Sequence, residues 1–155
     1  MGRPRKDFKN QIRKEVKRIE DDMWGVLHTA LLRTFEDSVR LCPVWTGYLR
    51  NHIYLEKERR SDLALTKDRD ENASYPLPKR PRLGKWDSYV LGDNAEYAEA
   101  VEYHGLAKTA PAGFMRIALA NFPKHVQAAK AERGKPTPVD DQNGATSPVL
   151  QGGEG

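Results

Sequence analysis

The segment 42–53 constrains the fold more than any other part of the chain, because the hydrophobic pattern changes its period there. Pro43 has no amide hydrogen and cannot continue a helix, so the helical repeat before it must end near Leu41. Thr46 and Gly47 predict a tight turn, in which glycine takes backbone angles that other side chains disfavour. Beyond this turn polar and apolar residues alternate, which predicts a strand with Leu49 on its apolar face. The structural corner is assigned to Pro43, Thr46, Gly47, Leu49 and Arg50.

Before the corner, apolar side chains recur at steps of three and four residues from Phe8 to Val39. This period predicts a long amphipathic helix of roughly 30 residues. Asp7 is the expected N-terminal cap. Gly25 is a weak point at which the helix could bend. Residues 1–6 are expected to form a flexible basic arm.

After the corner, residues 59–85 are rich in charge and proline. They predict a long loop, either exposed to solvent or facing DNA, or a long hairpin arm. Residues 86–92 alternate again and predict a second strand. Few large apolar side chains follow Gly134, so residues 134–155 are expected to be a flexible tail.

Two helices are expected in the second half of the chain. Asp93 and Asn94 predict a turn that caps a short helix, with Glu96 and Glu99 in its first turn and Gly105 at its end. Residues 114–133 predict a last helix. Pro123 lies inside it, so this helix should be kinked.

The sequence contains no arrangement of residues that indicates catalysis or metal binding. Its four histidines are scattered and lack the spacing of metal ligands. Cys42 is the one cysteine, so no internal disulfide can form. No apolar run approaches the roughly 20 residues that cross a bilayer. We therefore expect no enzyme activity, no cofactor, no metal and no membrane contact.

The net charge of +4 is mild, but basic residues gather in two clusters. One cluster lies on the polar face of the first predicted helix, and the other lies in the proline-rich part of the loop. Each is either a solvated surface or a contact with DNA or an acidic partner. The candidate contact residues are Arg13, Lys14, Lys17 and Arg18 in the helix, and Arg80, Arg82 and Lys85 in the loop.

Two segments carry a recognisable combination of short motifs. The first is the corner, Pro43-Val44-Trp45-Thr46-Gly47-Tyr48-Leu49-Arg50. The second contains Tyr97-Ala98 and Val101-Glu102-Tyr103-His104-Gly105, and a helix start at Phe114 follows it. In this order, and with a long helix before the corner, they resemble the tail-completion, or head–tail joining, proteins of long-tailed bacteriophages. The matching positions outside the corner are Tyr97, Ala98, Val101, Glu102, Gly105 and Phe114.

This resemblance implies an α+β fold in which a long N-terminal helix and a C-terminal helix pack on a small antiparallel β-sheet. Residues 1–133 would form one neck-protein domain with residues 59–85 as an extended loop, and residues 134–155 would be the flexible tail. The resemblance also implies a structural virion protein of the phage neck, assembled in the host cytoplasm.

The implied subunit forms a homo-oligomeric ring, commonly a hexamer. Its implied partners are the head connector or adaptor protein, the tail tube or tail terminator protein, and the packaged double-stranded DNA that passes through. An alternative function is a small basic nucleic-acid-binding module, whose binding should weaken steeply with salt. Aromatic residues are not interleaved with the basic ones as base stacking requires, so we prefer the structural role.

Overall fold

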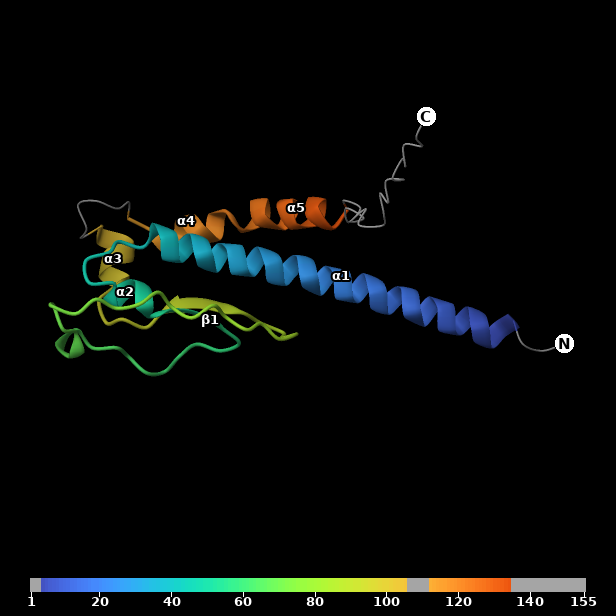
Figure 1. Ribbon diagram of the computed structural model, residues 1–155, viewed down its shortest axis with the longest axis horizontal. Coiled ribbons are helices and arrows are strands. Elements are labelled where there is room, and N and C mark those ends of the chain that lie inside the picture. Colours follow the sequence, from blue (N-terminus) through green and yellow to red (C-terminus); the bar gives the residue numbers. More distant parts are fainter. Residues whose placement is uncertain (1–3, 106–111, 135–155) are drawn as a thin grey trace, which may run out of the picture.

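The computed structural model describes residues 4–105 and 112–134, which form an α+β fold as predicted. One long helix runs the length of the molecule, and two shorter helices return beside it (Figure 1). A small antiparallel sheet lies near the C-terminal half of the long helix. In chain order the elements are α1 (Pro4–Leu41), α2 (Tyr48–Asn51), β1 (Ile53–Glu56), the 3₁₀ turn η1 (Thr66–Asp68), β2 (Val90–Asp93), α3 (Ala98–His104), α4 (Phe114–Ala120) and α5 (Phe122–Arg133).

Helix α1 ends at Leu41, as Pro43 predicts, but it begins earlier than expected. Its first residue is Pro4, and the fixed φ of proline suits the start of a helix. Asp7 lies in the first turn and is not the cap, so that prediction is wrong. Residues 4–6 of the expected flexible arm are therefore helical, while residues 1–3 lie outside the described residues.

Gly25 does not interrupt α1, which runs through it as one helix. A Cβ atom built on Gly25 would lie only 1.6 Å from the guanidinium of Arg133. Glycine at this position therefore leaves room for the tip of the Arg133 side chain against α1.

A helical turn, α2, replaces the first residues of the predicted strand, which begins only at Ile53 as β1. Gly47 has a φ of 86°, so the predicted need for glycine is confirmed. The amide of Asn51 then donates to the Gly47 carbonyl at 2.9 Å, which closes a helical turn. The prediction that Leu49 lies in a strand is wrong, although its side chain is still buried in the core.

Strands β1 and β2 pair antiparallel, with Ile53 opposite Asp93. The alternation predicted that the second strand begins at residue 86, but it begins at Val90. The reason is a side-chain contact: the Tyr89 hydroxyl donates to the Gly84 carbonyl at 2.6 Å and holds the preceding residues in an irregular bend.

The short helix α3 begins at Ala98, so Glu96, which was predicted to lie in its first turn, precedes it. Asp93 is the last residue of β2 and accepts a hydrogen bond of 2.9 Å from the Ala95 amide. Neither Asp93 nor Asn94 caps α3, whose N-cap is Tyr97, so the predicted cap is wrong. Glu96 precedes α3 and instead accepts a hydrogen bond of 2.8 Å from the Thr66 amide. Glu99 does lie in the first turn, and Gly105 ends the helix with a left-handed φ of 58°.

The predicted last helix is divided in two at Asn121, two residues before Pro123. Proline lies in the first turn of α5, where its missing amide hydrogen breaks no intrahelical bond. The carboxylate of Asp37 in α1 ties this junction down, because Oδ2 lies 2.7 Å from His125 Nε2 and 3.2 Å from Asn121 Nδ2.

The core lies where the C-terminal half of α1 meets the sheet, α3 and α4. Each large apolar side chain buried here contributes about 1.5–3 kcal/mol relative to exposure. The main contributors are Phe35, Leu49, Ile53, Leu55, Val101 and Phe114.

The loop of residues 59–85 has little regular structure beyond η1, but it is not a free arm. Tyr75 donates its amide to the Thr46 carbonyl at 2.8 Å. The Tyr48 hydroxyl donates to the Leu65 carbonyl at 3.1 Å. The loop is therefore tied to the corner. The predicted tail, apart from Gly134, lies outside the described residues.

The N-terminal half of α1 projects beyond the rest of the described structure (Figure 1). Residues 5–23 are all exposed, and partial burial begins only at Trp24. Among the described residues, no helix is long and apolar enough to cross a membrane.

Candidate functional site

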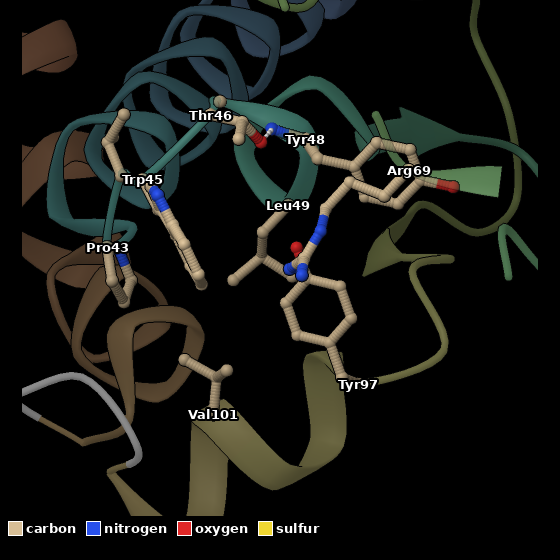
Figure 2. Close-up of a pocket in the computed structure, with 10 residues that line it drawn as sticks. Pro43, Trp45, Thr46, Tyr48, Leu49, Arg69, Tyr97 and Val101 are labelled. Carbon is tan, nitrogen blue, oxygen red and sulfur yellow. Dashed lines mark hydrogen bonds between the residues drawn. The ribbon is translucent and has the colours of Figure 1, made fainter. Parts of the chain in front are cut away.

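The fold brings the two motif segments together at the corner, although they are far apart in the sequence. Pro43, Thr46, Gly47 and Leu49 share one cavity of about 390 Å³ with Tyr97 and Val101 (Figure 2). Arg50 does not line this cavity. Its side chain lies beside another hollow, near Phe35, Leu77 and Arg80.

Hydrogen bonds within the corner and to the loop hold its conformation. The Tyr48 amide donates to the Thr46 hydroxyl at 3.3 Å. The Thr46 carbonyl accepts the amide of Tyr75 from the loop. A Cβ atom on Gly47 would lie 2.7 Å from the Tyr75 carbonyl oxygen, so the close approach of the loop requires glycine.

Aromatic side chains and one arginine form the walls of the corner cavity. The guanidinium of Arg69 lies 5.1 Å from the ring centre of Trp45 and 5.6 Å from that of Tyr97. It also donates to Glu71 at 2.9 Å. Trp45 is 77% exposed and stands at the rim. Large aromatic residues at such rims are frequent anchors of protein–protein contacts.

Burial shifts the pKa of two ionisable groups near the corner. Burial raises the pKa of the Cys42 thiol to about 12, so the reactive thiolate is scarce at neutral pH. Burial also raises the pKa of Asp93 to about 7, which is only partly offset by the backbone hydrogen bond from Ala95. No group of three or more potential metal ligands occurs among the described residues.

The remaining motif positions hold α3 and α4 together. Glu102 is only 7% exposed, and its carboxylate accepts the amides of Met115 and Arg116, each at 3.0 Å. It also pairs with the Arg116 side chain at 3.0 Å. This pair lies within the chain and anchors the start of α4. Ala98 and Phe114 are buried in the core.

The basic residues of the loop do not form a free tip. Lys85 donates to Asp21 of α1 at 2.9 Å, and Arg80 lies 4.0 Å from Glu36. The hydrogen bond from Lys85 lowers the pKa of Asp21. Arg82 is exposed. The loop cluster therefore lies along α1, with acids between its members.

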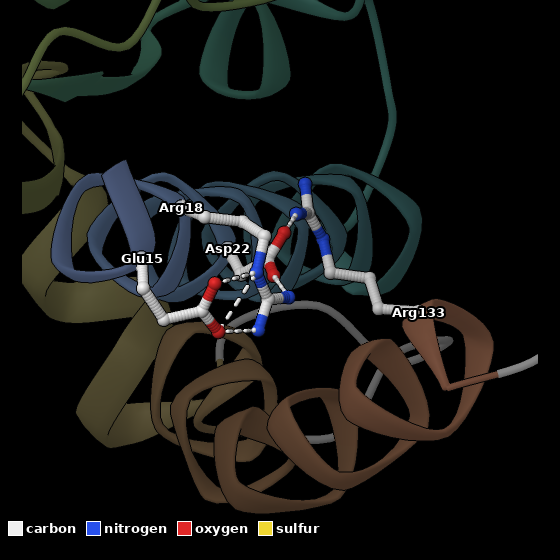
Figure 3. A network of polar contacts seen from close by, with 4 residues as sticks. All are labelled: Glu15, Arg18, Asp22 and Arg133. Carbon is white, nitrogen blue, oxygen red and sulfur yellow. Dashed lines mark hydrogen bonds and ion pairs between the residues drawn. The ribbon is translucent and has the colours of Figure 1, made fainter. Parts of the chain in front are cut away.

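The basic cluster of α1 is also mixed with acids. Arg18 bonds both Glu15 and Asp22, and the hydrogen bond from Arg18 lowers the pKa of Glu15 (Figure 3). Arg133 of α5 donates to Asp22 at 3.0 Å. The other members of the predicted cluster, Arg13, Lys14 and Lys17, are exposed.

The most prominent surface of the molecule was not recognised from the sequence. Five large apolar side chains of the projecting half of α1 are 47% to 67% exposed. We call them the apolar stripe: Phe8, Ile12, Val16, Ile19 and Met23. Their helical spacing indicated a face that packs on something, but not that α5 ends level with Asp22 and leaves this face open.

The apolar stripe runs into a groove between α1 and α5. This groove has a volume of about 910 Å³. Ile19, Met23 and Leu27 line it from α1, and Phe122 and Val126 line it from α5. Charged side chains also line it: Arg18, Glu20, Asp22, Lys130 and Arg133.

No family model, curated protein or solved structure matches this chain. Its function is therefore inferred from its own geometry and from the resemblance of its motifs.

Proposed function

We propose that the chain is a structural subunit of the neck of a long-tailed bacteriophage virion, assembled in the host cytoplasm. Copies of it form a closed ring, with six as the expected number. The ring joins the head connector or adaptor to the tail tube or tail terminator and lets DNA pass. The observation that carries this proposal is the projecting half of α1 with its exposed apolar stripe.

In an isolated subunit, the projecting half of α1 adds little to the stability of the fold, because its apolar face has nothing to pack against among the described residues. Fully burying one large apolar side chain is worth about 1.5–3 kcal/mol, and the five side chains of the stripe remain 47% to 67% exposed. Helices that stand alone in water are only marginally stable, because most helical stability in proteins comes from packing of the apolar face. The stripe is therefore best explained as a contact surface.

A second candidate contact lies at the opposite end of the molecule. The corner, with the exposed Trp45 and Val44, is distant from the N-terminus of α1 (Figure 1). A subunit with contact surfaces at both ends suits a layer held between two other layers. The corner cavity is lined mainly by apolar and aromatic side chains, as is usual for binding sites.

The alternative role in nucleic-acid binding has less support. Both basic clusters contain carboxylates within ion-pairing distance, notably Asp21, Asp22 and Glu36. A phosphate backbone would have to compete with these internal pairs, which lowers the gain from each contact.

Joining of heads to tails tests the proposed role directly. Heads and tails from a phage that lacks this chain should remain separate, and adding the purified chain should join them. Efficient joining in its absence would contradict the proposal. Replacing Arg80, Arg82 and Lys85 by serine asks in addition whether the loop takes part.

A further inference from the structure

The apolar stripe has the spacing of a coiled-coil seam. Ile12, Val16, Ile19 and Met23 follow one another at steps of four, three and four residues. A second helix packs on such a seam by inserting its side chains between those of the first. Farther along α1 the same seam reaches Ala30, which is fully buried within the chain. The open part of the seam thus continues a face that already packs helices.

We propose that the occupant of the stripe is α1 of a second copy, lying antiparallel, so that residues 8–16 of each copy fill the groove of the other. This proposal shares with the proposed function the premise that the stripe is a contact surface, and it adds the partner and the orientation.

The positions of the apolar residues support this arrangement because they are symmetric about one point. When Val16 of one helix lies opposite Ile19 of the other, Ile12 falls opposite Met23 and Phe8 falls opposite Leu27. The same three pairs form a second time with the two helices exchanged. Since Ile19, Met23 and Leu27 line the groove, the projecting half of each copy meets the groove of its partner.

The charges beside the seam favour the antiparallel orientation. In the register above, Arg13 of each copy lies across from Glu20 of the other, which gives two attractive pairs. On the other side of the seam, Glu15 lies across from Asp22. Within each copy Arg18 and Arg133 already bond these two acids (Figure 3). The carboxylates on this side of the seam are therefore matched by an equal number of arginines.

A parallel pair in the same register would place Glu15 of one helix beside Glu20 of the other. Like charges in this position repel and specify against the pairing. The two orientations therefore respond in opposite ways to a change at Glu20, which makes them separable by experiment.

A two-fold contact of this kind cannot join neighbours in a ring whose subunits all point the same way. Within the proposed function it would join two rings face to face, or two free subunits before assembly.

The test uses sedimentation equilibrium of the full chain and three charge variants. Arg13→Glu and Glu20→Arg should each weaken the pair about tenfold, because two attractive contacts become repulsive. The double variant should restore the affinity. Lys14→Glu, on the polar side of α1, is the matched control and should change nothing. Ile12→Asp with Val16→Asp should abolish the pair, while circular dichroism stays helical because both positions are exposed.

Two results would overturn the proposal. Stronger association of Glu20→Arg would indicate a parallel pair. Association unaffected by the aspartate variant would show that something other than a second α1 covers the stripe, and a chain ending at Gly134 would then test the C-terminal segment. Pairing through α1 without any ring would refute the proposed neck ring but not this contact. A ring that forms equally well with every α1 variant would refute this contact but not the proposed neck ring.

Discussion

Replacing Gly47 by alanine should destabilise the fold by about 2–4 kcal/mol. Part of this cost comes from the φ of 86°, since the left-handed region costs an L-residue about 1–2 kcal/mol. The rest comes from the new Cβ atom, which would lie 2.7 Å from the Tyr75 carbonyl oxygen. That oxygen belongs to the backbone, and the Tyr75 amide is bonded to Thr46 at 2.8 Å, so the loop and corner must separate.

Thermal unfolding followed by circular dichroism should show the loss as a decrease in Tm of roughly 5 °C or more. Both proteins must be compared at one concentration, because assembly also shifts Tm. Gly134→Ala is a suitable control. Gly134 has a helical φ of −76°, and a Cβ atom there would meet no atom closer than 3.7 Å.

The control should change the free energy of unfolding by no more than about 0.5 kcal/mol. If Gly47→Ala melts at the same temperature as Gly134→Ala, the corner is not held as described. The contact between Thr46 and Tyr75 would then have no structural importance.

Three further changes test other parts of the fold. Asp37→Ala removes the acceptor for His125 and Asn121 and should cost about 1.5–3 kcal/mol in urea denaturation; a smaller loss would mean that apolar contacts alone hold α5. Glu102→Gln removes the charge that anchors α4 and should lower Tm, while Glu99→Gln on the exposed side of α3 should not. Burial raises the pKa of Asp93 from 3.8 to about 7, so the folded state retains a proton that the unfolded chain has lost. The native protein should therefore lose stability, relative to Asp93→Asn, as the pH rises from about 4 to 7; parallel pH profiles would contradict this.

The local signals in the sequence were sufficient for the corner. Pro43 ends α1 at Leu41 through the covalent chemistry of its own ring. Gly47 occupies a conformation that only glycine adopts freely. The helical turn at Tyr48–Asn51 could not be distinguished in advance, because an alternation of four residues fits either a strand or one turn of helix.

Features that depend on distant contacts were missed. The composition of residues 59–85 predicted a long loop, but not the hydrogen bonds from Tyr75 to Thr46 and from Tyr48 to Leu65 that tie this loop to the corner. The period of α1 correctly predicted an apolar face. It could not indicate that α5 covers only part of that face, since this depends on where Arg133 meets Asp22.

The mass of the intact assembly tests the central claim most directly. Native mass spectrometry of the purified full chain should find one closed assembly with six times the 17.6 kDa of the subunit, or twelve times if two rings meet through α1. Monomers or simple dimers alone, across the micromolar range, would contradict a self-assembling neck ring.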